Sequence, residues 1–185
     1  MAELYIKADD FCPSSAAFFG MMGAACAIVF CNLGAAYGTA KAGVGVCHLA
    51  IMDHKLIIKG LVPCVMAGIL GIYGLIISVL IVNQVKPKNG YSGYKGYAHL
   101  SAGLSTGLSS LAGGMAIGIV GDAGVRAYGK QSKVYTGLLL IMIFSEALAL
   151  YGLIVGLLTS NIPGGPKCPK VENLTYNQTK INLNQ

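Results

Sequence analysis

The chain has 185 residues, of which 55% are hydrophobic and only 11% are charged. A soluble domain carries about 25% charged residues, so this chain has too few to solvate a globule, and its apolar content also excludes disorder, collagen and a disulfide scaffold. The formal net charge is +6, but the thirteen basic residues lie in short loops and tails, which is typical of membrane flanks rather than of nucleic-acid binding. A small protein that crosses a membrane several times remains.

Four long stretches that are nearly free of charge predict four transmembrane helices. Residues 11–40, 60–85 and 96–121 contain no Asp, Glu, Lys or Arg, and residues 134–166 contain a single charge, Glu146. Each is longer than the roughly 20 residues that cross about 30 Å of hydrocarbon. The predicted fold is therefore all-α and membrane-embedded, with helices over about 14–40, 57–83, 97–124 and 134–160.

The helices pair into two hairpins joined by a short connection and followed by a polar tail. Acidic residues precede the first helix, where a signal peptide would have a basic segment, so we do not expect that helix to be cleaved off. Tyr91, Tyr94 and Tyr97 in the connection resemble an interfacial aromatic belt. The expected segments are an N-terminal piece 1–13, a first hairpin 14–83, a connection 84–96, a second hairpin 97–160 and a tail 161–185.

The orientation in the membrane stays open at this level. The connections between helices one and two and between three and four carry six Lys or Arg, and the opposite side carries seven, so the positive-inside rule gives a tie. The tail holds two glycosylation sequons, at Asn173 and Asn177, which would place it in a lumen if they are glycosylated. Among the six cysteines no metal spacing occurs, although Cys12 and Cys168 could meet.

The two halves of the chain resemble each other. The segment IYGLIISVLI at 72–81 matches LYGLIVGLLT at 150–159 with an offset of 78, and GAAYG at 34–38 matches GMAIG at 114–118 with an offset of 80. We interpret this as a duplicated two-helix hairpin. Both copies run in the same sense, because an even number of crossings separates them.

Helices one and three are rich in glycine at helical spacing, which lets helix backbones approach closely in lipid. One interpretation is ordinary packing inside one subunit. The other, which we favour, is an inner ring of such helices from several copies, because two glycine-rich helices offer more small faces than one bundle needs. The glycines expected to pack are Gly34, Gly38, Gly107, Gly114 and Gly118.

Glu146 is the residue on which a function depends. It lies near the middle of the fourth helix, and its counterpart at the offset of 78 is Gly68. A charge at the bilayer centre costs about 2.5–3.5 kcal/mol on insertion scales, so desolvation favours the neutral, protonated acid. No Lys or Arg lies within the four nearly charge-free stretches to pair with it. Such a group can carry a proton through hydrocarbon and release it only where water or a cation from another chain meets it.

A structural role is the alternative, in which neighbouring Ser145 or Tyr151 keeps the acid neutral by hydrogen bonding. Gly68 and Tyr73 complete the expected surroundings of the carboxyl. A sodium site would need several oxygen ligands, which the sequence does not offer near Glu146, so protons are the favoured ion. We expect no catalytic residue, metal or cofactor.

Two further signals carry no function. Residues 124–131 approach the phosphate-binding loop pattern, but Gln131 stands where Ser or Thr is needed and no strand precedes it. His99 begins the third helix, where it could sense pH at the interface, and nothing else in the sequence supports that role.

The motifs together resemble the proteolipid c subunits of vacuolar-type proton ATPases. They cover residues 14–160, in order and with the same duplication, and the most specific is the last. They are GAACAIVFCNLGAAYGTAKAGVG at 23–45, GIYGLIISVLIV at 71–82, LSAGLSTGLSSLAGGMAIGIVGDAGVRA at 100–127 and IFSEALALYGLIVGLL at 143–158.

The resemblance implies a rotor ring built from several copies and paralogous proteolipids, with helices one and three inside and two and four facing lipid. The essential carboxyl of the family falls on Glu146, which an Arg of stator subunit a would meet. ATP hydrolysis would take place in a separate soluble sector. The connections 1–2 and 3–4 would face the cytosol and central-stalk subunit d, and both termini would face the lumen of a vacuole or another acidic organelle.

Two other classes of protein remain as alternatives. A structural four-span protein that forms an oligomeric pore or junction explains the helices and glycines but not one mid-membrane acid in only one half. A small secondary transporter is supported only by that single ionisable residue. The tail of about 25 residues after Ser160 departs from the family pattern, which leaves its role and the choice between the main c type and a paralogue open.

Overall fold

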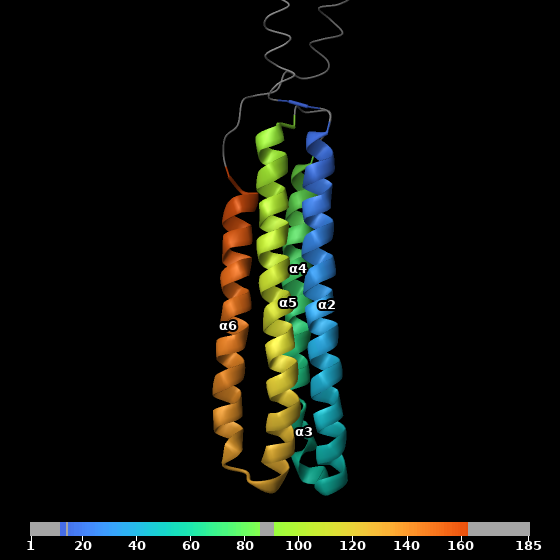
Figure 1. The fold of residues 1–185 in the computed structure, drawn as a ribbon, viewed down its shortest axis with the longest axis vertical. Coiled ribbons are helices and arrows are strands. Elements are labelled where there is room, and N and C mark those ends of the chain that lie inside the picture. Colours follow the sequence, from blue (N-terminus) through green and yellow to red (C-terminus); the bar gives the residue numbers. More distant parts are fainter. Residues whose placement is uncertain (1–11, 14, 86–90, 163–185) are drawn as a thin grey trace, which may run out of the picture.

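The computed structural model describes residues 12–13, 15–85 and 91–162, and these residues form helices and turns without any strand (Figure 1). Four of the helices are long and apolar enough to cross a membrane, which confirms the predicted all-α, four-span fold. The elements in order are α2 (Ala16–Met52), the 3₁₀ helix η1 (His54–Leu56), α3 (Ile57–Gly60), α4 (Val62–Gln84), α5 (Gly93–Lys130) and α6 (Val134–Ser160).

Helices α2 and α5 are longer than predicted, with 37 and 38 residues. The predicted ends at residues 40 and 124 are wrong, because charged residues that leave the hydrocarbon are good helix formers and do not stop a helix. Arg126 supports the extension, since its Nε lies 2.8 Å from Oδ1 of Asp122 one turn earlier. At about 1.5 Å per residue these helices exceed the thickness of the hydrocarbon.

The four helices run side by side along one axis (Figure 1). Helix α5 packs against all three others, α4 lies against both α2 and α5, and α6 lies against α5 and α4. Helices α2 and α6 form the two opposite edges of the bundle (Figure 1). Both hairpins therefore stand next to each other in the same sense, as the duplication predicts.

Close backbone contact holds α2 against α5. A Cβ added to Gly34 would lie 2.6 Å from the carbonyl oxygen of Ser110 and 2.7 Å from Cα of Leu111, and one added to Gly118 would lie 2.9 Å from Cα of Gly38. Gly114 faces Gly34 at similarly close range. Any side chain at these positions would push the helices apart, so glycine is required by the approach of the two backbones.

The packing of α4 on α2 is repeated by α6 on α5 with a single offset of 78. In each hairpin a glycine of the second helix (α4 or α6) contacts two residues one turn apart on the first helix (α2 or α5). The offset of 80 read from GAAYG and GMAIG is therefore wrong for the spatial equivalence of the first helices. The matching sets are Gly74 with Ala27 and Cys31, and Gly152 with Ser105 and Ser109.

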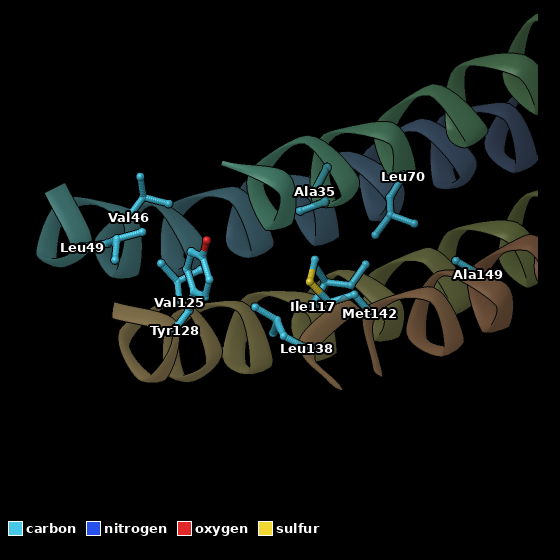
Figure 2. Close-up of a cluster of buried hydrophobic side chains, with 11 residues drawn as sticks. Ala35, Val46, Leu49, Leu70, Ile117, Val125, Tyr128, Leu138, Met142 and Ala149 are labelled. Carbon is cyan, nitrogen blue, oxygen red and sulfur yellow. The ribbon is translucent and has the colours of Figure 1, made fainter. Parts of the chain in front are cut away.

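The apolar core lies along the line where the four helices meet (Figure 2). Leu70 of α4 and Ala149 of α6 lie at one end of this cluster, and Leu49 of α2 and Tyr128 of α5 lie at the other (Figure 2). Large side chains such as Leu49, Leu70 and Met142 fill this core, whereas glycines bring the backbones of α2 and α5 together.

Candidate functional site

Glu146 lies deep within α6, twelve residues after its first residue and fourteen before its last. At about 1.5 Å per residue, both helix ends are roughly 20 Å away, which places the carboxyl near the middle of a membrane span. The side chain is half-buried.

Tyr73 of α4 is the hydrogen-bond partner of this carboxyl. Its phenol oxygen donates to Oε1 of Glu146 at 3.1 Å. The tyrosine ring is half-buried and packs against the apolar core, so the phenol is held in place by its surroundings. The bond joins the outer helices of the two hairpins and fixes the carboxyl against α4.

The other residues predicted around the carboxyl lie nearby without contacting it. The hydroxyl of Ser145 donates to the carbonyl of Ile141 in its own helix at 3.1 Å. The Tyr151 side chain is 62% exposed on the outer surface. A Cβ added to Gly68 would meet no described atom within 4 Å. Of the four predicted neighbours, the structure brings only Tyr73 to Glu146.

The carboxyl has no cation within the described part of the chain, where the one ion pair joins Asp122 to Arg126 near the end of α5. Its sequence neighbours Ile143 and Phe144 are strongly exposed and apolar, as a surface in contact with lipid requires. An ionised Glu146 would therefore have no counter-charge beside it among the residues that the structure describes.

The described residues contain no group of three His, Cys, Asp or Glu side chains that could hold a metal ion. Near Glu146, the hydrogen-bonding contact that the structure records is the phenol of Tyr73. Cys12 is disulfide-bonded. Cys168, Asn173 and Asn177 lie outside the described residues, so their predicted pairing and glycosylation stay predictions.

A second polar cluster, which the sequence did not reveal, joins the start of α5 to the end of α6. His99 is 1% exposed, and its Nε2 lies 3.2 Å from the carbonyl oxygen of Ser160. Because a carbonyl only accepts, Nε2 carries the proton, and Nδ1 accepts from the phenol of Tyr91 at 2.6 Å. Both ring nitrogens therefore have a partner in this structure.

Burial raises the pKa of Tyr91 to about 12, which keeps its phenol protonated as the donor to His99. The prediction that three tyrosines form an interfacial belt is thus wrong for Tyr91, which is buried, whereas Tyr94 and Tyr97 are exposed. The His99 ring is also enclosed by protein, and its expected role as a pH sensor stays a prediction. Spacing along the sequence could not show this, because Ser160, which pairs with the ring, lies 61 residues from His99.

The match to known proteins follows the two hairpins. The family model described as the ATP synthase C subunit matches residues 22–81 and again residues 100–159. The two matches begin and end 78 residues apart, which is the offset that the packing repeats. The fold and this double match define the class: the chain belongs to the ATP synthase C family.

The most similar relatives narrow the class to proteolipids of V-type ATPases. The V-type proton ATPase 16 kDa proteolipid subunit of Chrysotila carterae is 61% identical over 157 residues, which span 83% of this chain and 96% of the relative. The V-type proton ATPase proteolipid subunit of Dictyostelium discoideum is 54% identical, over 83% of this chain and 78% of its own length. The 16 kDa proteolipid c subunit of Nephrops norvegicus is 55% identical, over 78% and 91%.

Membership of this family makes the chain a multi-pass, non-catalytic membrane subunit that assembles with other subunits. The resemblance inferred from the motifs is confirmed.

Proposed function

We propose that this chain is a proton-carrying rotor subunit of a V-type ATPase, and that Glu146 is the group that binds and releases the proton. The observation that carries this proposal is a solitary carboxyl at mid-span, hydrogen-bonded by Tyr73 and without an ion-pair partner in the described part of the chain. An acid in that position is costly unless it is used or neutralised.

In this proposal the two carboxyl oxygens have separate tasks. Oε1 accepts the hydrogen bond from Tyr73, and Oε2 carries the transported proton. In this neutral state the carboxyl crosses the lipid as the rotor turns. Release needs a place where water or a positive charge stabilises the carboxylate, and such a charge must come from another subunit.

The remaining parts of the proposal concern partners and direction. An Arg of stator subunit a would meet Glu146, subunit d would contact the rotor on the cytosolic side, and paralogous proteolipids would share the rotor. Protons would move from the cytosol into the lumen of a vacuole or another acidic organelle, with both chain termini luminal. The transport itself needs no cofactor in this chain.

The test replaces Glu146 in cells that lack the native subunit. We expect Glu146→Gln to abolish ATP-driven acidification of isolated vesicles while the complex still assembles. The matched control is Asp122→Asn, which removes a carboxyl at the end of α5 and should leave acidification intact. Acidification that survives Glu146→Gln would refute the proposal and leave the structural four-span alternative.

A further inference from the structure

The end of the bundle that holds η1, α3 and the start of α6 is strongly basic (Figure 1). Residues 41–59 and 122–133 carry six Lys or Arg side chains and two Asp. Asp122 pairs with Arg126, and the carboxylate of Asp53 accepts from the backbone N–H of Lys55. Within the described part of the chain, the lysines at this end therefore have no ion-pair partner. They are Lys41, Lys55, Lys59, Lys130 and Lys133, and all of them are exposed.

Two of these lysines lie at the depth of lipid headgroups. Lys59 stands 14 residues before Tyr73 on one candidate span, His54–Gln84, and Lys133 stands 13 residues before Glu146 on α6. At about 1.5 Å per residue, both are roughly 20 Å from the level of the Tyr73–Glu146 hydrogen bond. The headgroup layer lies about 15–22 Å from the middle of a bilayer, so a carboxyl at mid-span puts both lysines among the phosphates.

The exposed face of the second helix leads to this depth as an apolar strip. Ile58, Leu61, Val65 and Ile72 follow one another at helical spacing and are between 44% and 82% exposed. Lys59 adjoins the end of the strip, and the long lysine stem lets its ammonium reach a phosphate while its methylenes stay on apolar surface. A surface that is apolar along its length and basic at its end matches a phospholipid, whose acyl chains lie beneath a charged headgroup.

The duplication repeats the basic residue. Lys55 and Lys133 are 78 residues apart, so each hairpin carries a lysine just before the helix that follows its turn. Leu56 and Tyr135, which come soon after these lysines, both pack against the same apolar core cluster. The two turns are thus fixed to one body, and their lysines stay exposed at the same end of the bundle.

From this depth, charge and apolar strip we infer that Lys59 and Lys133, with Lys55 beside them, bind the headgroups of anionic phospholipids. The inference rests on the proposed function only for the leaflet, since the proposed orientation places this end in the cytosolic leaflet, where anionic lipids concentrate. A soluble acidic protein fits less well, because it would have to enter the headgroup layer to reach these lysines.

Such lipids would set the depth of the proton site. Headgroups held at Lys59 and Lys133 lie about 20 Å from the carboxyl on both helices that the Tyr73–Glu146 bond joins. A shift of the chain along the membrane normal would pull both lysines out of the phosphate layer. The bound lipids therefore keep Glu146 at the middle of the bilayer.

The experiment measures which lipids the protein retains at its surface. The assembly that contains the full-length chain is purified and placed in phosphatidylcholine vesicles with a trace of spin-labelled phosphatidylserine or spin-labelled phosphatidylcholine. Electron paramagnetic resonance then separates immobilised from free lipid. We expect phosphatidylserine to be preferred, and the double variant Lys59→Gln/Lys133→Gln to lose up to about fivefold of that preference for each lysine removed.

Two variants serve as controls. Lys59→Arg/Lys133→Arg keeps both charges and should keep the preference, whereas Lys95→Gln at the opposite end of α5 should leave it unchanged. Sodium chloride and sodium phosphate at equal ionic strength should weaken the preference equally, because both only screen exposed charges.

Equal retention of the two lipids by the unmodified protein would overturn the inference, and so would an unchanged preference in the double glutamine variant. A stronger effect of phosphate than of chloride would indicate a site for free phosphate and would also overturn it. Normal lipid retention with lost binding of a soluble subunit would show that the lysines serve a protein partner instead. Glu146→Gln should retain phosphatidylserine as the unmodified protein does, which separates this inference from the proposed proton transport.

Discussion

Replacing Gly34 by Leu tests whether backbone contact between α2 and α5 holds the chain together. The new Cβ would lie 2.6 Å from the carbonyl oxygen of Ser110 and 2.7 Å from Cα of Leu111. Both are backbone atoms, so neither can rotate away. Ordinary contact begins at 3.4 Å, so the helices must separate by about 0.8 Å before the rest of the leucine is accommodated.

The cost follows from the packing lost and the strain gained. A gap of about 0.5–1 Å forfeits a quarter to a half of the dispersion energy of the atoms that face it. Overpacking by additional methylenes costs about 1–3 kcal/mol, and the isobutyl group adds several carbons. The better helix propensity of leucine returns less than about 1 kcal/mol. We expect a net destabilisation of about 3 kcal/mol, which is roughly a hundredfold in the folding equilibrium.

The matched control is Gly137→Leu in α6, where an added Cβ would meet no described atom within 4 Å. This variant should be at least as stable as the unmodified chain, because leucine favours the helix more than glycine does. The assay is the midpoint of thermal unfolding in detergent, combined with maleimide labelling of Cys31, which is fully buried one turn before Gly34. Gly34→Leu should lower the midpoint and expose Cys31. Equal midpoints and equal labelling for the two leucine variants would refute the reasoning.

The site and the second polar cluster give three further predictions. Tyr73→Phe removes one hydrogen bond to Glu146, worth about 0.5–1.5 kcal/mol, so the rate of vesicle acidification should fall by up to about tenfold with normal assembly. Tyr151→Phe is the control and should have no effect. Equal acidification rates for the two variants would contradict the role of Tyr73. His99→Phe leaves the buried phenol of Tyr91 and the buried carbonyl of Ser160 unpaired, at a cost of about 1–3 kcal/mol each. The variant should therefore have a lower midpoint of thermal unfolding in detergent. An unchanged midpoint would show that water replaces the ring. Because burial raises the pKa of Tyr91 from 10.0 to about 12, the unfolded chain ionises first, so stability should fall between these two pH values, and Tyr91→Phe should flatten that part of the curve; an identical slope would exclude Tyr91 as its origin.

The membrane spans were predictable because the charge-free runs are a direct consequence of the cost of charge in lipid. The same signal misplaced two helix ends, since the boundary of the hydrocarbon is not the boundary of a helix. Lys41 and Asp122 leave the apolar region, yet α2 continues to Met52 and α5 to Lys130. The composition of a helix depends on the solvent around it, whereas the ends of a helix depend on local capping. After α2 ends, for example, the Asp53 carboxylate caps η1 by accepting from the backbone N–H of Lys55.

Glu146 was predictable from the sequence because a lone acid in a long apolar run is costly and persists where a function uses it. Its partner was harder to choose, since Ser145 and Tyr151 are closer along the helix than Tyr73 is along the chain. A serine inside a helix can satisfy its hydroxyl on the preceding turn, as Ser145 does on Ile141, so nearness in sequence is poor evidence of contact. The contact with Tyr73 depends on which faces of α4 and α6 meet.

The duplication offset taken from the sequence match of the glycine motifs differs from the offset taken from the helix contacts. Glycines favour the offset of 80, because small residues recur on every face of these helices and short matches among them arise easily. The contacts of Gly74 and Gly152 select 78, since a shift of two residues turns a helix by about 200° and would present the wrong face. That rotation decides which residues of α2 and α5 remain open.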